Sequence, residues 1–379
     1  MPKVEELLCT VLRGEKAPWP EHGDADFAAR FLERSAHHGV QALLHHHFQN
    51  WQGAAPGWPE IVLDACRTQA RAQTMWEMRH KDLLDRVLAR LTDAGVEPIL
   101  FKGTALAYSL YPAPFLRARG DTDLIVPSSL RDRTAEVLES LGFARARGAV
   151  GEIVTYQANY CRTEPAGDMH AFDLHWRITN SQLLSNLFSY EELRHDAVLL
   201  PALGAHAIAA SPVCALALAC MHRAIHKQIP YYVDGVVDRS VDRLIWLYDI
   251  HLLFGTLSPA QQHEFVELAD VKGLRATCLE AIEQARACFH GPVPEAVLAA
   301  LAGPGRPEPA ADYLGGSAWY QFYADFWALE DVRSKLGFLA ELLLPPASDM
   351  RLKYPQARRT WLPWLYLRRA SGGLLKRFR

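Results

Sequence analysis

Two aspartates stand directly before an apolar run in the segment Asp121-Thr122-Asp123-Leu124-Ile125-Val126. Alternate residues of a strand point to the same side of a sheet, so Asp121 and Asp123 project together while Thr122 projects to the opposite side. Neighbouring carboxylates repel unless a cation lies between them, and Mg²⁺ prefers one or two carboxylates together with phosphate oxygens. An Asp-x-Asp alone is more often a turn or a solvated strand end. Here, its position before a buried strand predicts a divalent metal site.

A segment suited to phosphate precedes the acid pair, where an apolar run, 96–101, gives way to a helical run, 105–110. Gly103 lets the backbone approach a phosphate, the helix N-terminus offers unpaired N–H groups, and the Thr104 hydroxyl adds a donor. Lys102 supplies a cation that could contact a triphosphate. A phosphate site beside a metal-binding acid pair indicates nucleotide chemistry.

A third acid lies on a later strand, within residues 170–178. Side chains alternate along this run, with Phe172, Leu174 and Trp176 on one face and Asp173, His175 and Arg177 on the other. This is the pattern of a half-buried strand with a polar face. If the strand lies beside that of Asp121, Asp173 completes a cluster of three carboxylates. His175 is either a ligand or a hydrogen-bonded structural histidine, and the structural role is favoured.

These residues resemble the polymerase-β-like nucleotidyltransferase superfamily, in which a Gly-Gly or Gly-Ser opens a helix, Asp-x-Asp or Asp-x-Glu follows on the next strand, and a third carboxylate comes from a later strand. More narrowly, the chain is similar to a bacterial group of nucleotidyltransferase family proteins. The matching residues are Lys102-Gly103, Tyr111-Pro112, Arg117 and Asp173-Leu174-His175-Trp176. The specific motifs span only residues 96–178, and the gap from Gly103 to Asp121 is longer than in many superfamily members.

The resemblance implies a nucleotidyltransferase that uses Mg²⁺ or Mn²⁺ and an NTP such as ATP. Asp121 and Asp123 would bind two metal ions, and Asp173 would bind one of them and take the proton from the attacking hydroxyl. Two metal ions suit in-line displacement at phosphorus. The nucleotide would be held by Lys102, Gly103, Thr104 and Arg117, although Arg117 could instead pair with an aspartate in the core.

The resemblance leaves the acceptor open. A hydroxyl or phosphate of a small molecule, a sugar or a peptide is expected to receive the NMP, with release of pyrophosphate. Two alternatives remain: a non-catalytic nucleotide-binding sensor or scaffold, and a toxin-type enzyme that modifies protein or tRNA. The presence of all three acids argues against the non-catalytic alternative.

The elements around these residues predict an α+β fold, with a small mixed-sheet nucleotidyltransferase core flanked by N- and C-terminal helical regions. The divisions are 1–94 (helical), 95–203 (core), 204–345 (helical) and 346–379 (a basic aromatic tail). Within the core we expect strands at 96–101, 121–126, 152–161 and 169–178, and helices at 104–110 and 129–141. Ser128 or Ser129 should cap the second of these helices after Pro127. A buried helix is expected to begin near Pro212.

Several histidines and one further aspartate are weaker candidates for site residues. His45, His46 and His47 cannot all face one ion on a helix, so a solvated helix end is favoured. His222 and His226 are spaced to share a helix face, but no third ligand is evident in the sequence and packing is favoured. Asp249, in a helix that resembles one of the narrower group, is interpreted as structural or cavity-lining.

The composition is that of a globular protein large enough for two domains, with 379 residues of which 50% are hydrophobic and 22% charged. The net charge of -3 argues against generic binding to nucleic acid. Seven scattered cysteines without a CxxC pattern are expected to be reduced thiols. With no secretory signal visible, a cytoplasmic location is expected.

The tail from Arg351 to Arg379 is both basic and aromatic. It could contact an acidic acceptor or, peripherally, an anionic membrane surface. The favoured alternative is a terminal segment whose aromatic side chains, Trp361 and Trp364 among them, pack on the body of the protein while its charges stay in water. Packing on the body is favoured because Pro363 is expected to interrupt an amphipathic helix.

Overall fold

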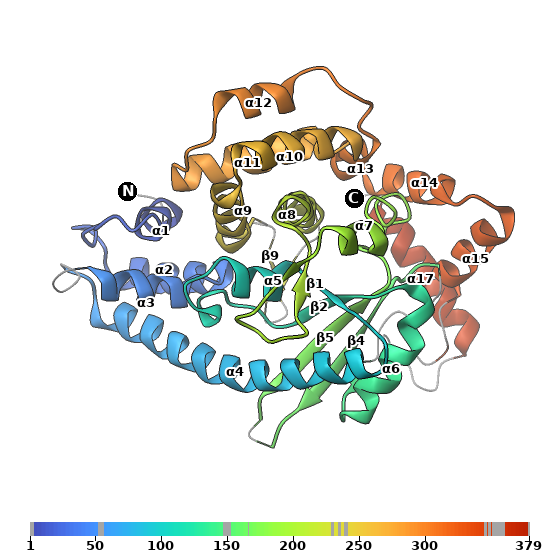
Figure 1. Ribbon diagram of the computed structural model, residues 1–379, viewed down its shortest axis with the longest axis horizontal. Helices are drawn as coiled ribbons and strands as arrows, with labels where there is room; N and C mark the ends of the chain where they lie inside the picture. Colours follow the sequence, from blue (N-terminus) through green and yellow to red (C-terminus); the bar gives the residue numbers. More distant parts are fainter. Residues whose placement is uncertain are drawn as a thin grey trace.

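A single mixed sheet lies at the centre of the protein, enclosed by helices (Figure 1). The computed structural model describes residues 4–51, 57–146, 153–165, 167–228, 231–233, 236–238, 242–344, 347, 350 and 361–377. The strands of the sheet are β1 (Ile99–Phe101), β2 (Thr122–Ile125), β3 (Ala144–Arg145), β4 (Gln157–Thr163), β5 (Met169–His175), β6 (Val198–Leu199) and β7 (Ile208–Ala209). Their order across the sheet is β3-β4-β5-β2-β1-β7-β6. A separate hairpin joins β8 (Tyr231–Val233) to β9 (Val236–Asp238).

The strand that carries the acid pair lies in the middle of this sheet. β2 is antiparallel to β1 and parallel to β5, with Asp123 directly opposite Asp173. The adjacency expected of the 121–126 and 169–178 strands is therefore confirmed. β2 is buried along its whole length, as expected of a central strand with apolar neighbours on both sides.

One face of the sheet packs on a long helix, α4 (Glu60–Asp93), which follows the N-terminal helices α1 (Val4–Leu12), α2 (Ala25–His38) and α3 (Gln41–Asn50). The second half of α4 carries apolar residues at helical spacing, among them Leu84, Leu88 and Leu91, and these are fully buried. They share a core with Leu100 of β1 and Leu124 of β2, so this apolar stripe faces the sheet. α4 ends at Asp93, just before Gly95, whose φ of 73° suits a glycine.

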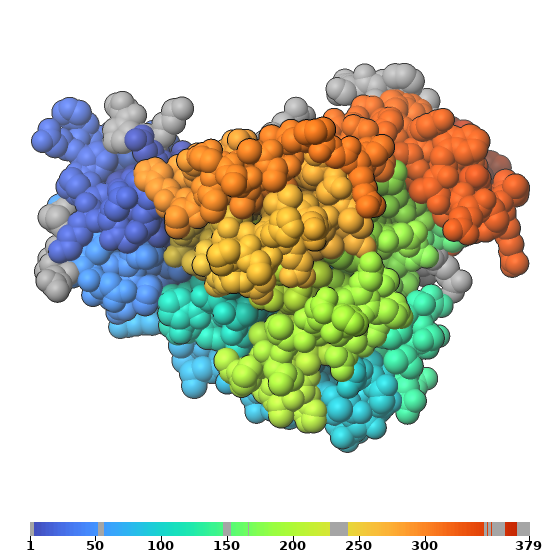
Figure 2. Space-filling view, turned by 45° about the horizontal axis from the view of Figure 1, so that its top comes forward, coloured from blue at the N-terminus to red at the C-terminus, as the bar shows by residue number. Residues whose placement is uncertain are grey.

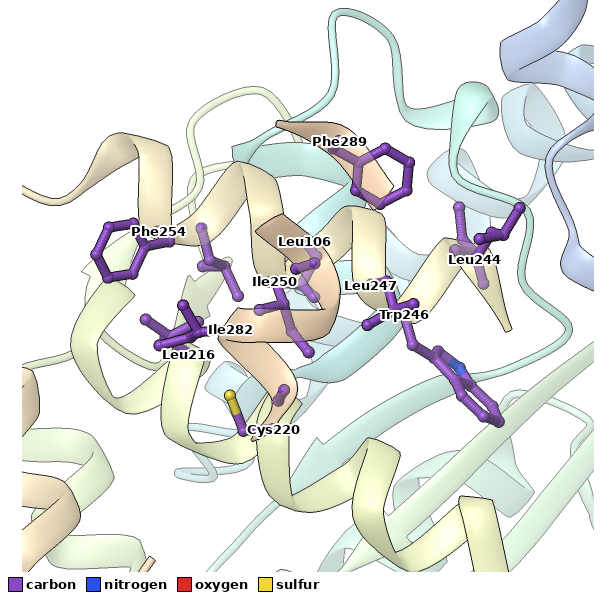
Figure 3. Close-up of a cluster of buried hydrophobic side chains, with 14 of the residues drawn as sticks. Leu106, Leu216, Cys220, Leu244, Trp246, Leu247, Ile250, Phe254, Ile282 and Phe289 are labelled. Atoms are coloured by element: carbon purple, nitrogen blue, oxygen red, sulfur yellow. The ribbon is translucent and has the colours of Figure 1, made fainter. Parts of the chain in front are cut away.

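The opposite side of the site is formed by α5 (Lys102–Ser109) and a group of helices from the second half of the chain. These are α8 (Pro212–Gln228), α9 (Leu244–Thr256), α10 (Pro259–Val271), α11 (Arg275–Phe289), α12 (Glu295–Ala302) and α13 (Pro309–Gly315). Figure 3 shows how they converge: Leu106 of α5 lies among Leu216 of α8, Ile250 of α9 and Ile282 of α11. α8 begins at Pro212, where the buried helix was expected.

The remaining helices are α6 (Arg131–Ser140) and α7 (Tyr190–His195) beside the sheet, and α14 (Ala318–Ala328), α15 (Val332–Leu343) and α17 (Leu362–Arg377) at the end of the molecule opposite α1 to α3 (Figure 1). Two short 3₁₀ helices, η1 (Pro114–Leu116) and η2 (Ser128–Leu130), follow α5 and β2. No helix among the described residues is long and apolar enough to cross a membrane.

Two local expectations were wrong. Neither Ser128 nor Ser129 caps the helix that follows Pro127, because both lie in η2 and α6 starts after Leu130 without a side-chain cap. Pro363 does not interrupt α17, because it lies in the first helical turn, where a proline costs no backbone hydrogen bond.

Two further features differ from what the sequence suggested. Trp361 and Trp364 are 75% and 59% exposed rather than packed on the body of the protein. β6 and β7 join the sheet on either side of residue 203, where the core was expected to end.

Candidate active site

Asp123, Asp173 and His175 form the acidic centre of the site. The parallel pairing of β2 with β5 places Asp123 level with Asp173, and the alternation along β5 returns His175 to the same face. One donor atom from each of the three side chains lies within 4.8 Å of the others, which is close enough to hold one metal ion. No other cluster of this kind is found among the described residues, His45 to His47 included.

Lys102 and His175 share one oxygen of Asp123. The Lys102 Nζ lies 2.7 Å from Asp123 Oδ1, and His175 Nε2 lies 3.0 Å from the same atom. Burial disfavours the charged form of Asp123, but Lys102 and His175 outweigh this and hold its pKa well below the usual range. Burial and Lys102 lower the pKa of His175, so its ring is assigned as neutral with the proton on Nε2, donated to Asp123.

The backbone at Lys102 is strained in a way that serves this contact. Phe101 pairs with Asp123 across β1 and β2, so the chain leaves the strand beside the acid. Lys102 then adopts a φ of 56°, a left-handed conformation that residues other than glycine rarely adopt. Such strain costs on the order of 1 kcal/mol and persists only where the surroundings enforce it. Here it turns the chain into α5 with the ammonium group over the acid pair.

Asp121 carries the negative charge that the protein balances least well. Burial, together with the nearby charges of Asp123 and Asp173, raises its pKa to about 6, although Lys102 and Arg117 act in the opposite direction. No described residue donates a hydrogen bond to its carboxylate. Three carboxylates therefore face one lysine and a neutral histidine. A divalent cation with oxygen ligands fits this donor set and this deficit of positive charge.

Arg117 is committed to a buried ion pair. Its Nη2 lies 2.7 Å from Asp249 Oδ2, and the Tyr111 hydroxyl donates to the other oxygen of the same carboxylate at 2.6 Å. Of the two roles that the sequence left open for Arg117, the pairing with an aspartate is therefore present. Its Nη1 would lie 3.0 Å from a Cβ at Gly103, so a side chain at that glycine would press on the ion pair. The structural interpretation of Asp249 is confirmed.

Thr104 faces away from the acids. It is fully buried, and its hydroxyl contacts Thr122 Oγ1 at 2.9 Å and accepts a hydrogen bond from Arg119 Nε at 3.0 Å. Its contribution to nucleotide binding stays a prediction, because in this structure its hydroxyl is engaged with protein groups. Lys102, Gly103 and Arg117 do line the cavity described below.

A buried polar network that sequence reasoning missed supports β2 from behind. Arg119 pairs with Glu77 of α4 at 2.7 Å, and the Tyr108 hydroxyl donates to the same carboxylate oxygen at 2.6 Å. His80, also on α4, lies 2.7 Å from Thr122 Oγ1 and 3.1 Å from the ring of His170. The sequence signal was present but weak: Gln73, Glu77 and His80 are the polar residues of an otherwise apolar buried stripe.

One further residue was missed on the strand beside β5. Asn159 of β4 stands opposite Asp173 in the antiparallel register, and its side-chain amide donates to Asp173 Oδ1. Because alternation in β4 puts Asn159 on the same face as the acids, register would have identified it. The amide fixes one oxygen of Asp173 and leaves the other available.

The acids open into a single large cavity of about 990 Å³. Its walls come from the sheet, from α4, from α8 and α9, and from the segment around α14. His222 and His226 contribute a pair of rings on the α8 side, tilted by 48° with centroids 4.3 Å apart, and both rings lie within 6 Å of Trp246. The cavity is at the upper end of ligand-site volumes, which range from about 300 to 1,000 Å³, so two substrates can be held together.

Comparison with known proteins agrees with this geometry. The chain matches a family described as uncharacterised nucleotidyltransferase over residues 25–290, which contain every acid of the cluster and the whole sheet. A comparison with curated proteins gave no match. Because the match covers most of the chain, the protein belongs to this nucleotidyltransferase family and is a nucleotidyltransferase enzyme.

Proposed function

We propose that the protein transfers NMP from an NTP to an acceptor in a reaction that depends on Mg²⁺ or Mn²⁺ and releases pyrophosphate. The observation that carries the proposal is the pairing of β2 with β5, which sets Asp123 opposite Asp173 at the wall of a cavity that Asp121, just before β2, also lines. Family membership supports nucleotidyl transfer and an NTP as substrate. The choice of metal, nucleotide and acceptor is our inference.

The donor set fits a hard divalent cation, held by Asp121, Asp123 and Asp173, with His175 either as a further ligand or as the group that orients Asp123. When bound, such a cation stabilises the charge that develops on the attacking and leaving oxygens at phosphorus. Asp123 is already ionised and oriented by His175, so it can act without losing a proton first. The site thus has its negative charge in place before substrates bind.

Lys102 and Asp173 have the clearest roles among the other groups. The Lys102 ammonium lies beside Asp123 on the cavity wall, where it can exchange its carboxylate partner for a phosphate oxygen of the NTP. Asp173 keeps one oxygen free while Asn159 holds the other. That free oxygen is placed to accept the proton of an acceptor hydroxyl as it attacks the α-phosphate.

The cavity lining favours a neutral, hydrogen-bonding acceptor. Six amide side chains line it: Gln41, Gln69, Gln73, Gln157, Asn180 and Gln321. Amides both donate and accept hydrogen bonds, which suits the hydroxyl and amide groups of a sugar, a peptide or another small molecule. Such groups have no charge with which to attract a nucleic acid backbone.

Pyrophosphate release tests the proposal. Purified protein with Mg²⁺ or Mn²⁺, each of the four NTPs and a panel of sugar, peptide and small-molecule acceptors should release pyrophosphate and give a product heavier by one NMP. Asp123→Asn should abolish both signals, because the cation loses a charged ligand while the side-chain volume is kept. Asp132→Asn is the matched control, since Asp132 on α6 is 87% exposed and does not line the cavity.

The same measurement discriminates between catalysis and sensing. Nucleotide binding that requires the cation and Asp123, yet gives no pyrophosphate with any acceptor, would contradict catalysis and favour a nucleotide sensor. Labelling of protein or tRNA, but of no small acceptor, would instead indicate the toxin-type reaction.

A further inference from the structure

Three C-terminal helices, α14, α15 and α17, expose apolar side chains to an unusual extent. Of the ten tryptophans in the chain, four are exposed, and all four belong to this region: Trp319, Trp327, Trp361 and Trp364. The other six are buried or half-buried. None of these helices falls within the residues that match the family. The exposure therefore belongs to a part of the chain added to the nucleotidyltransferase core.

The exposed side chains on α14 form one face of that helix. Trp319, Tyr323 and Trp327 follow one another at intervals of four residues, and their exposed fractions are 41%, 59% and 58%. No residue of α14 is fully buried. This eleven-residue helix therefore presents a large aromatic surface to solvent on that face.

α15 repeats the arrangement with aliphatic residues. Val332, Leu336 and Leu343 lie at i, i+4 and i+11, which puts them on one stripe, and they are 71%, 62% and 54% exposed. The only buried residue of α15, Phe338, faces away from this stripe and contacts Phe322 of α14 with ring centroids 6.0 Å apart. α15 is therefore attached to α14 by one side and open on another.

α17 adds a third apolar stripe to the same end of the molecule. Trp364 and Leu367 are exposed, whereas Leu365 is buried. Arg369 ties α17 to α15 by donating to the Leu342 carbonyl at 2.6 Å. We call the exposed side chains of the three helices the C-terminal face: Trp319, Tyr323, Trp327, Val332, Leu336, Leu343, Trp361, Trp364 and Leu367. Figure 2 shows α14 and α15, in orange, on the outside of the molecule.

The charge of the C-terminal sequence indicates what covers the C-terminal face. Residues 351–379 contain nine arginines and lysines and no aspartate or glutamate, whereas the rest of the chain carries 31 basic and 43 acidic residues. A basic segment on an acidic protein is attracted to an anionic surface. Two copies of this chain meeting through the same face would bring their basic segments together, which like charges disfavour.

We propose that the C-terminal face docks on an anionic lipid surface. Tryptophan and tyrosine are the side chains that settle at the headgroup level of a bilayer, and arginine and lysine beside them attract anionic lipids. Leucine and valine stripes supply the apolar area that enters the acyl boundary. Because no described helix can span a bilayer, the protein lies on the surface.

α14 links this docking to the candidate active site. Its opposite face carries Gln321 and Asp325, which line the cavity. Asp325 also fastens the helix to the core, accepting from the Ser181 hydroxyl at 2.9 Å and from the Tyr313 hydroxyl at 2.8 Å. A helix is about 10 Å across, so docking brings the cavity wall within roughly that distance of the lipid headgroups. An acceptor that resides at a membrane surface could then reach the acids.

Vesicle flotation with the full-length protein tests the proposal. Protein is mixed with vesicles of phosphatidylcholine alone or with about 30% phosphatidylglycerol, at low and at high salt. We expect co-flotation with the anionic vesicles, a blue shift of tryptophan fluorescence, and a large loss of both at high salt because exposed charges are then screened. Exclusive binding to neutral vesicles, or no binding to either, would overturn the proposal.

Two sets of variants separate the apolar and the charged contributions. Trp327→Ser, Leu336→Ser and Trp364→Ser together should weaken partitioning at least tenfold, since each removes exposed apolar area. The matched control is Ile61→Ser, Met75→Ser and Met78→Ser on α4, whose residues are 66%, 54% and 68% exposed and should not matter. Arg358→Gln and Arg359→Gln should weaken partitioning by about fivefold for each charge removed.

Two further measurements distinguish membrane docking from a loss of catalysis and from self-association. Pyrophosphate release from soluble substrates should be unchanged in all these variants, so a failure of membrane docking is distinguishable from a failure of the proposed nucleotidyl transfer. Light scattering should show a monomer. A stable dimer that dissociates in the Trp327, Leu336 and Trp364 variant would show that a second copy covers the face and would overturn the proposal.

Discussion

At the scale of single residues, the pKa values of Asp123 on β2 and of Asp121 just before it are shifted in opposite directions. Asp123 is ionised because Lys102 and His175 contact one of its oxygens. Asp121, two residues earlier, has no such partner among the described residues, and burial raises its pKa to about 6. Ionised Asp121 therefore carries an unfavourable charge that a cation would stabilise. This imbalance is the physical basis for expecting the metal at this place.

The first prediction concerns the stability of the metal-free protein. The pKa of Asp121 when folded, about 6, exceeds its ordinary value, so its contribution to folding is full at low pH and is lost as the pH rises through 6. Asp121→Asn removes the ionisable carboxyl group, so the variant does not lose this stability as the pH rises. In EDTA at about pH 7.5 the variant should melt a few degrees above wild type, and the two should melt together near pH 4. Added Mg²⁺ should stabilise only the wild type.

An exposed aspartate provides the control for that experiment. Asp132→Asn changes an exposed aspartate on α6 and should melt with wild type at every pH. An Asp121→Asn variant that is less stable than wild type above the pKa of Asp121 would mean that the carboxylate makes a favourable contact, which would contradict a deficit of positive charge around it.

The second prediction concerns Lys102. Its ammonium occupies a position beside Asp123 Oδ1, so it competes with a cation for that oxygen and is available to a phosphate. Lys102→Met keeps most of the aliphatic stem and removes the charge. Calorimetry should show tighter binding of Mn²⁺ alone but roughly tenfold weaker binding of the metal–NTP complex, as expected for the loss of one charge-assisted contact. Weaker binding of both would indicate that Lys102 only keeps the site folded.

At the scale of elements, the strands of the site could be predicted but their edges could not. Alternation along the sequence of β5 predicted that Asp173 and His175 share one face, and the apolar run after Asp123 predicted a buried strand. The structure confirms both predictions. β6 and β7 have two residues each, too few for any periodicity to show. The predicted start of α6 was wrong because Ser128 and Ser129 belong to the 3₁₀ helix η2, which a capping pattern in the sequence does not reveal.

The long-range polar pairs escaped prediction for a different reason. Arg117 and Asp249 meet across 132 positions of sequence, and Glu77 meets Arg119 across 42. No local pattern encodes such pairings, because they depend on how α4 and α9 pack on the core. Sequence reasoning could therefore identify the acids and Lys102 but not the contacts that hold the loop from Tyr111 to Gly120 in place.

The third prediction tests that support. Arg117, Tyr111 and Asp249 join the loop after α5 to α9 through buried groups, with side-chain exposures of only 10% for Arg117 and 3% for Asp249. Asp249→Asn leaves the guanidinium buried without its counter-charge, so the free energy of unfolding should fall by about 3–5 kcal/mol. Urea denaturation measures it. The exposed pair Arg194–Glu97 is the control, and Glu97→Gln should cost less than about 1 kcal/mol.

At the scale of the whole molecule, the family match ends before the C-terminal helices begin. Residues 25–290 carry the family match, the sheet and the acids, whereas α14, α15 and α17 lie outside that range. The sequence favoured packing of Trp361 and Trp364 on the body, because Pro363 was expected to interrupt an amphipathic helix. The structure leaves both exposed, and what distinguishes them is their setting among nine basic residues with no acid in 351–379.

The last prediction follows from that setting. Deleting Arg351 to Arg379 should leave binding of the metal–NTP complex unchanged, since Lys102, Asp121, Asp123 and Asp173 lie in the core. Among its described residues the tail buries one large apolar side chain, Leu365, and donates from Arg369 to α15, so its loss should lower the melting temperature by about 5 °C or less. Binding to anionic vesicles should disappear. A much larger fall in melting temperature, with vesicle binding retained, would mean that the tail is a packed structural segment and that α14 and α15 alone contact the membrane.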